Sequence, residues 1–502
     1  MNLAEIFWES ESEYVGKPLL YMEGRKVSFG EAGDGIRKFL GVLGTRSIKP
    51  NDIVILAVPN SVEWLISFFA IVSAGGVCVP VNPALTAGEI ATIVRHCRPN
   101  LVVASTELLG SFVEFAGSIS IIEIDLQDPG SSEWHKLLES SSPVKEVVNL
   151  SADHPALIFY TSGTTGVPKG VLLSHGAELF TADLVSRHMV ITRRDTSLVM
   201  GSLAFRYHSI LNMVSSIKGG ASLILQSRFH PATAAADIQR YGATFLMGVP
   251  TMYIMMANWA ATNEADFSSV RLALTAGASF PNSLRRRIRE QLHLEVFDLW
   301  GLTECSPITS FDPVQETEGE PDSCGRAMPG CELRIADPDL QEVEVGKIGE
   351  ILVKSPGRMT GYYKDPVSTE ATIVDGWLRS GDLGKVDARG LLYIVGRSKD
   401  LIIRGGANVY PLDVEEVLYR HPSVVECAVI GKPDPLFGET VLAFIVTEGE
   451  ASAESILNHC RETLATYKVP NEVRFVQRLP KGPTGKILKR QLREQLLNQD
   501  FH

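Results

Sequence analysis

Apolar segments of two lengths alternate along the first part of the chain. "DIVILAVP" (52–59) has the length of a buried strand, "SVEWLISFFAIVSAG" (61–75) has the length of a helix, and "VCVPV" (77–81) is short again. Strands and helices in alternation form βαβ units, so this order predicts an α/β fold with a mostly parallel sheet covered by helices. Polar residues, glycines and a proline interrupt 64–81, so we expect a buried helix and strand there and no integral membrane segment.

A second, smaller domain is predicted at the C-terminal end. The chain has 502 residues, more than the roughly 250–300 that one hydrophobic core serves. From about residue 346 the pattern changes to short strands and tight turns, with a hairpin turn expected at 387–390, and after "GRSKD" (396–400) a compact α+β pattern begins with a helix opened by Pro411. We predict domains over 1–396 and 397–502, with a hinge near 396–400.

Charge and cysteine content exclude several classes of function. The net charge of −12 argues against nucleic acid as a partner and against attachment to an anionic membrane. The seven cysteines are scattered without a CxxC pair, which argues against a zinc site and against a disulfide framework. The start "MNLAEIFWESESEY" lacks a signal-peptide pattern, so a cytoplasmic protein is expected.

The most informative loop is "YTSGTTGVPKGV" (160–171), which follows the strand-like "PALIFY" (155–160). Its glycines let the backbone approach a ligand closely, its hydroxyls donate hydrogen bonds without adding charge, and Lys169 supplies one cation. A polyphosphate would suit this loop. The Walker loop is excluded because Pro168 precedes the lysine and Gly170 follows it. On composition alone, an ordinary surface loop remains the alternative.

Five motifs in order resemble those of the adenylate-forming superfamily, which includes acyl-CoA synthetases of the AMP-dependent synthetase and ligase family. They are "YTSGTTGVPKGV", "WGLTE" (300–304), "GWLRSGD" (376–382), "GRSKDLIIRGGANVYPLDVEE" (396–416) and "PKGPTGK" (480–486). The resemblance implies a large N-terminal adenylation domain of several subdomains, which binds AMP and the acid, and a mobile C-terminal domain. It also implies ATP, Mg²⁺ and CoA as cofactors and co-substrates.

By this resemblance, residues of the first two motifs hold the phosphates. Thr303 would contact the α-phosphate, and Glu304 would bind Mg²⁺. The residues expected around the departing pyrophosphate are Thr161, Ser162, Gly163, Thr164, Thr165 and Lys169.

The nucleoside would be bound by a second set. Asp382 would accept from both ribose hydroxyls, and Arg397 would reach the same sugar. Trp300 replaces the usual tyrosine, and its flat indole can still stack on adenine. From "TAGAS" and "FDLWG", the residues assigned to the nucleotide site are Gly277, Ala278 and Asp298.

The small domain would act twice. Lys486 would bridge the substrate carboxylate and the α-phosphate as the catalytic cation. Rotation about Lys399, the hinge residue by position, would then withdraw it and bring Gly405 and Gly406 to line the passage for pantetheine.

The acid is the least determined part of the site. Where many acyl-CoA synthetases have a "PLFH"-like motif, "SLAFRYHS" (202–209) has Arg206 at the usual histidine and His208 two places on. Arg206 either pairs with a second polar or anionic group of the substrate, or it serves no substrate and is turned outward or bonded to a carboxylate of the protein. Met247 and Leu299 are the other expected pocket residues. A fatty or aromatic monocarboxylic acid of modest size is favoured.

The predicted activity is that of an ATP-dependent carboxylic acid:CoA ligase working through an acyl-AMP, with possible homodimer formation. A stand-alone adenylating enzyme that loads a separate carrier protein is the alternative. A catalytically silent nucleotide-binding protein is the alternative from another class, opposed by the presence of Lys169, Glu304, Asp382 and Lys486.

Overall fold

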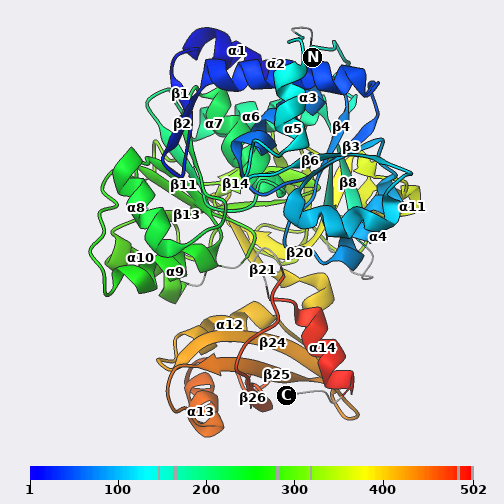
Figure 1. The fold of residues 1–502 in the computed structure, drawn as a ribbon. Coiled ribbons are helices and arrows are strands. Elements are labelled where there is room, and N and C mark those ends of the chain that lie inside the picture. The colour runs from blue at the N-terminus through cyan, green and yellow to red at the C-terminus, as the bar shows by residue number, and fades with distance from the viewer. Residues whose placement is uncertain are drawn as a thin grey trace.

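The chain folds into a large N-terminal domain and a small C-terminal domain, which lies below the first in Figure 1. Both combine helices with sheets, and several of the large domain's strand pairs are parallel. The predicted α/β class with a small α+β domain is therefore confirmed. The computed structural model describes residues 1–144, 147–161, 168–278, 280, 282–316, 319–482 and 487–498.

The first sheet contains the predicted βαβ units. β3 (Ile53–Ala57) pairs in parallel with β4 (Val77–Pro80), and α3 (Val62–Ser73) joins them, capped by the Ser61 side chain that accepts from Trp64 N. The helix and strand predicted over 64–81 are confirmed, and none of the described helices is long and apolar enough to cross a membrane. The sheet runs in the order β18 (Gly361–Tyr362), β8 (Lys169–Ser174), β7 (Pro155–Thr161), β4, β3, β5 (Leu101–Ser105), β6 (Ser120–Ile124).

β7 and β8 depart from the parallel pattern. β7 lies parallel to β4, but β8 returns antiparallel to it, with Thr161 opposite Lys169. The loop predicted to bind phosphate therefore joins the two strands of a hairpin at an edge of the sheet where only β18 follows.

The second sheet gathers several parallel strands of the central sequence. β11, β12 and β13 are parallel, with Gly248 opposite Thr275 and Thr275 opposite Asp298, so the carboxyl ends of these strands meet at one edge. The sheet runs in the order β15 (Arg326–Ala327), β14 (Cys305–Ser310), β13 (Val296–Leu302), β12 (Leu272–Thr275), β11 (Phe245–Gly248), β9 (Thr196–Val199), β10 (Ser222–Leu225), β1 (Pro18–Met22), β2 (Arg25–Ser28).

Helices cover these two sheets and close a common apolar core that includes Trp64, Phe69, Leu157 and Met247. α2 packs against α3 and α5, and α9 packs against α8 and α10. The helical segments of this part are α1 (Glu5–Tyr14), α2 (Phe29–Thr45), α3, α4 (Ala87–Cys97), η1 (Thr106–Phe115), α5 (Glu133–Ser140), α6 (His175–His188), the π-helical η2 (Tyr207–Val214), α7 (Ser215–Lys218), α8 (Pro231–Tyr241), α9 (Pro250–Ala260), α10 (Asn282–Leu292) and α11 (Pro366–Thr372).

A third, antiparallel sheet leads to the small domain. β20 (Trp377–Val386) and β21 (Leu392–Arg397) form the hairpin predicted around 387–390, where Asp387 N donates to Leu391 O at 3.1 Å. The remaining strands are β16 (Glu332–Ala336), β17 (Gly349–Lys354) and β19 (Ile373–Val374).

The small domain has its own sheet and core. The predicted helix at Pro411 is α12, whose Val414 and Leu418 pack on Val429 and Val441 of the sheet. Its elements are β22 (Ile402–Arg404), β23 (Ala407–Val409), α12 (Pro411–Tyr419), β24 (Val424–Asp434), β25 (Gly438–Thr447), α13 (Ala453–Thr463), β26 (Glu472–Phe475) and α14 (Lys489–Asn498).

A short connection, η3 (Ser398–Asp400), links β21 to the small domain. Arg397 still pairs with Asp382 of the large domain, whereas Ile402 belongs to the small-domain core. Arg493 of α14 lies 2.9 Å from Asp400, which ties this connection to the last described helix. The domain boundary at 396/397 and the hinge role of Lys399 stay predictions.

Candidate active site

Three residues expected to bind the nucleoside lie together. Arg397 Nε is 3.0 Å from Asp382 Oδ1, and the Trp300 indole donates from Nε1 to Asp382 Oδ2 at 3.1 Å. Asp382 is buried. A carboxylate offers about four lone-pair positions, so each oxygen retains one for a ribose hydroxyl.

Thr303 and Glu304 form the tip of a β-hairpin. β13 ends at Leu302 and β14 begins at Cys305, and these two residues pair across the turn. Met359 N donates to Glu304 O at 2.7 Å, and the Tyr362 hydroxyl donates to Glu304 Oε1 at 2.9 Å. The turn is therefore held by Met359 and by Tyr362 of β18, which lie more than fifty residues later in the sequence.

Lys169 contacts the same tyrosine. Its Nζ donates to Ser368 Oγ at 2.8 Å and lies 4.7 Å from the centre of the Tyr362 ring. Burial and the nearby Glu304 raise the pKa of Tyr362, so its hydroxyl keeps the proton that it donates. The structure thus brings Lys169 and Glu304 to one side chain. Of the other residues expected around pyrophosphate, Thr161 pairs with Lys169 in the hairpin, and those outside the described residues are Ser162, Gly163, Thr164 and Thr165.

Glu304 offers a single carboxylate, which fits a metal ion that binds together with a nucleotide. Within the described ranges, no three histidine, cysteine, aspartate or glutamate residues are grouped as an all-protein metal site would need. Mg²⁺ in nucleotide sites takes one or two carboxylates and completes its shell with phosphate oxygens and water. One carboxylate beside Lys169 meets that requirement.

Arg206 bonds a carboxylate of the protein, which is one of the predicted alternatives, and it is not turned outward. Its Nε and Nη2 donate to Glu178 at 2.9–3.2 Å, and both side chains are buried. Nη1 donates to Thr303 O at 3.1 Å, and Nη2 also reaches Thr181 Oγ1 and Gly357 O. Each of the three guanidinium nitrogens of Arg206 has a partner within the protein, which favours this alternative over the pairing with a charged substrate group. The arginine instead supports the backbone of the Thr303 turn.

His208 lies in η2 and is buried, and its Nδ1 has no hydrogen-bond partner among the described residues. Burial lowers its pKa to about 3, so the ring is neutral near pH 7. Its Nε2 would be 2.2 Å from a Cβ placed on Gly201, which shows how closely the ring packs on that glycine. The remaining expected pocket residues, Met247 and Leu299, are buried in one apolar cluster together with Trp300.

Asp298 is held by a partner that the sequence pattern did not indicate. Arg285 of α10 forms a short ion pair with its carboxylate and also donates to Val296 O. Burial raises the pKa of Asp298, and Arg285 acts in the opposite direction. Gly277 and Ala278, just beyond β12, are exposed, and Gly277 has a φ of +86°. Contacts of these three residues with a nucleotide stay predictions.

The expected residues of the small domain and of the connection to it are Gly405, Gly406, Lys399 and Lys486. Gly405 and Gly406 have φ of +57° and +82°, and Gly405 N donates to Phe437 O at 2.8 Å within the small domain. Burial, Arg397 and Arg493 lower the pKa of Lys399. Lys486 lies outside the described residues.

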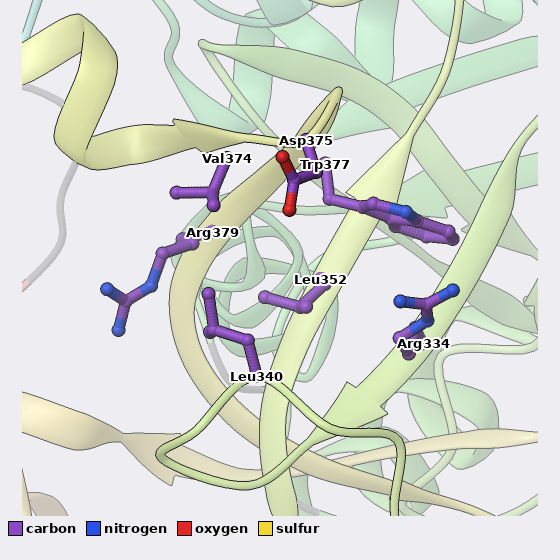
Figure 2. Close-up of a pocket in the computed structure, with 7 residues that line it drawn as sticks. All are labelled: Arg334, Leu340, Leu352, Val374, Asp375, Trp377 and Arg379. Carbon is purple, nitrogen blue, oxygen red and sulfur yellow. The ribbon is translucent and has the colours of Figure 1, made fainter.

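Two cavities elsewhere do not suit a carboxylic acid substrate. The first, on the third sheet, has a volume of about 40 Å³, and Figure 2 shows the Trp377 indole above the Arg334 guanidinium at its side, 4.4 Å from ring centre to guanidinium carbon. That volume holds about one water molecule. The second, of about 240 Å³, lies near the start of β12, and its Arg271, Glu295 and Glu316 are each paired with another charged side chain.

The fold has two polar groups that suit a nucleotide-binding enzyme: Asp382 with Trp300 and Arg397, and Glu304 with Lys169 around Tyr362. The chain belongs to the AMP-binding enzyme family: the family model matches residues 7–363, and the model of the AMP-binding enzyme C-terminal domain matches residues 413–486. The family predicted from the five motifs is confirmed.

Relatives and solved structures cover almost the whole chain. A long-chain-fatty-acid–CoA ligase of Bacillus subtilis (strain 168) is 29% identical, with 98% of this chain and 94% of that protein covered. An indoleacetate–CoA ligase of Aromatoleum aromaticum is 30% identical, with 100% and 99% covered. A crystal structure of the anthranilate CoA ligase AuaEII in complex with anthranoyl-AMP superposes with a TM-score of 0.91 at 28% identity, covering 98% of this chain and 97% of that one.

Proposed function

We propose that this protein is an AMP-forming carboxylic acid:CoA ligase whose substrate is a fatty or aromatic monocarboxylic acid. The family, and relatives that join acids of both kinds to CoA, support the reaction class. The indicated acid has a single carboxylate and an uncharged body.

The observation that carries this choice of acid is the closed ion pair of Arg206. Its charge is neutralised by Glu178, and its Nη1 and Nη2 also donate to two backbone carbonyls and a threonine. His208 beside it is neutral because burial lowers its pKa to about 3. A second carboxylate or a sulfonate on the substrate would have to leave water beside Arg206, whose charge Glu178 already neutralises. Burying such an uncompensated charge is strongly unfavourable.

The reaction has two steps. A carboxylate oxygen of the acid attacks the α-phosphorus of ATP, the bond to the bridging oxygen breaks, and pyrophosphate leaves. The CoA thiol, losing its proton, then attacks the acyl carbonyl, and AMP leaves as the thioester forms. Adenylation is needed because a free carboxylate is a poor electrophile.

Residues of the large domain bind and orient the nucleotide. Asp382 holds the ribose, with Trp300 and Arg397 fixing its two oxygens, and Lys169 holds the leaving pyrophosphate. Thr303 meets the α-phosphate on a turn supported by Arg206. Glu304 would hold Mg²⁺, and this ion would supply positive charge against the leaving group.

The small domain supplies groups for both steps. Lys486 neutralises the charge between carboxylate and α-phosphate, and rotation about Lys399 then exchanges it for the Gly405–Gly406 segment. The positive φ of both glycines gives a backbone that side-chain-bearing residues rarely adopt, which suits a narrow passage for pantetheine. We place the enzyme in the cytoplasm, consistent with seven free cysteines.

ATP–pyrophosphate exchange with a panel of acids tests the proposal. The panel should hold fatty, aryl and arylacetic acids together with dicarboxylic and sulfonated acids of the same length. We expect exchange with an acid that has a single carboxylate and no other charged group, followed by thioester formation with CoA. Exchange only with the doubly charged acids would overturn the choice of acid, exchange without CoA transfer would favour a carrier protein, and no exchange would favour a silent binder.

A further inference from the structure

Tyr362 lies between two groups that act on different parts of the nucleotide. Its hydroxyl donates to Glu304 Oε1 at 2.9 Å, and the face of its ring lies 4.7 Å from Lys169 Nζ. A phenol is well suited to both contacts, because its proton bonds a carboxylate and its ring attracts a cation. The two partners are therefore set at a fixed spacing by one side chain.

The backbone around Tyr362 leaves that side chain little freedom. β18 pairs with β8 so that Tyr362 lies opposite Val171, two residues beyond Lys169. Tyr362 N also donates to Thr369 Oγ1 of α11 at 2.9 Å. The preceding Gly361 packs so closely on α11 that a Cβ there would lie 2.8 Å from the Thr369 methyl carbon. The tyrosine is thus fixed by a strand on one side and a helix on the other.

Lys169 has one further partner. Its Nζ donates to Ser368 Oγ at 2.8 Å, and Ser368 N is bonded to Asp365 at the start of α11. A phosphate oxygen can replace the serine hydroxyl without moving the ammonium away from the Tyr362 ring, because the ammonium has three N–H donors and Ser368 takes one of them. The same ring can therefore steady the lysine before and after the nucleotide binds.

We propose that Tyr362 is a positioning residue for MgATP, which orients the Glu304 carboxylate through its hydroxyl and the Lys169 ammonium through its ring. The inference rests on the roles of Glu304 and Lys169 in the proposed function. It separates the two parts of the side chain: the hydroxyl serves the metal-binding carboxylate, and the ring serves the phosphate-binding lysine.

Calorimetric titration with ATP, in Mg²⁺ and again in EDTA, tests the two parts separately. Tyr362→Phe removes the hydroxyl and keeps the ring, whereas Tyr362→Leu removes both. For Tyr362→Phe we expect MgATP to bind roughly tenfold more weakly, the effect of one lost hydrogen bond to a charged group, and metal-free ATP to bind as it does to the wild type. Tyr362→Leu should weaken both.

Tyr363→Phe is the matched control, because Tyr363 is adjacent in sequence but lies edge-on to His96, 5.8 Å between ring centres, in another cluster. It should bind ATP as the wild type does under both conditions. Melting temperatures of all three variants check folding, and the ratio of the two affinities within one variant is independent of how much protein is folded.

The ratio of the affinity for MgATP to the affinity for metal-free ATP decides the outcome. An unchanged ratio in Tyr362→Phe, whether both affinities stay the same or fall together, overturns the proposal and leaves a packing role. Failure of the proposed function is seen separately. If the variants show the expected affinities but the wild type exchanges pyrophosphate with no acid, the positioning role of Tyr362 stands and the ligase assignment is lost. A wild type that binds no ATP overturns both.

Discussion

The indole of Trp300 donates its N–H to Asp382 Oδ2 at 3.1 Å. The residue expected to stack on adenine and the carboxylate expected to hold the ribose are therefore bonded to one another, across two different sheets. Where the family usually has tyrosine, this chain has an indole whose N–H donates to the carboxylate. The orientation of Asp382 is set jointly by Trp300 and by Arg397 on the other oxygen.

Trp300→Phe should reduce discrimination between ATP and 2′-deoxyATP. The ring surface remains, but Asp382 loses the donor that fixes Oδ2, and we expect the preference for ATP in kcat/KM to fall roughly three- to tenfold. Pyrophosphate exchange with each nucleotide measures it. Trp377→Phe is the control, because that indole packs on Arg334 of the third sheet. A preference that survives in Trp300→Phe but is lost in Asp382→Ala would show that the indole does not orient the carboxylate.

Lys486→Ala should separate the two half-reactions. Adenylate formation should fall by about a hundredfold or more, because a cation positioned on the transition-state charge is removed. Thioester formation from a supplied acyl-AMP and CoA should remain close to the wild-type rate. Equal losses of both half-reactions in a folded variant would contradict the alternation of the small domain between them.

Arg206→Met should destabilise the large domain strongly. It leaves the Glu178 carboxylate, which is 0% exposed, without its cation, and about 3–5 kcal/mol of unfolding free energy should be lost in urea titrations. Arg206→Met combined with Glu178→Leu should recover most of this loss. Arg187→Met is the control, because Arg187 lies on α6, the helix of Glu178, and its pair with Asp183 is exposed. This exposed pair should contribute less than about 1 kcal/mol. If the double variant is no more stable than the single one, the buried charge is not the cause.

His175 should make stability fall in mild acid. Its Nδ1 accepts from Leu3 N at 3.0 Å, and burial, with His154 nearby, lowers its pKa from 6.5 to about 4. The unfolded chain therefore binds the proton first as pH falls, so this contribution is complete above pH 6.5 and is lost toward about pH 4. We expect about 2 kcal/mol less stability at pH 5 than at pH 7.5 from this group.

Urea unfolding across that pH range measures the effect. His175→Asn keeps an acceptor for Leu3 N without a titrating ring, and its stability should depend less on pH by that amount. His293→Asn changes an exposed histidine and should leave the pH dependence as it is. An identical slope in His175→Asn and the wild type would rule out the assignment to His175.

The sequence predicted the elements that depend on local pattern. The βαβ unit of β3, α3 and β4, the turn at 387–390 and the helix at Pro411 all follow from apolar period, turn residues and caps, and the structure has each of them. The ordered motifs predicted the family for the same reason, because each is a continuous string of residues.

The contacts between motifs could not be predicted. Glu304 with Tyr362 and Arg206 with Glu178 join residues that no spacing rule relates, and each depends on how two sheets and a helix pack. The ambiguity of Arg206 shows the limit most clearly. An arginine in a pocket motif serves the substrate or the protein according to whether a carboxylate faces it, and Glu178 lies on α6, a helix that no motif includes.

The last described helix, α14, is joined by ion pairs both to the connection between the domains and to the small domain. Arg493 of α14 is bonded to Asp400 in η3, and Lys489 at the start of α14 is 2.7 Å from Glu415 of α12. Lys486 precedes this helix by three residues in the sequence. In the proposed rotation of the small domain, a change of backbone angle at residues 398–401 would move α14 together with the rest of the domain, because these two ion pairs join the helix to η3 and α12. A few dihedral angles in the connection would then determine how far the lysine three residues before α14 is displaced.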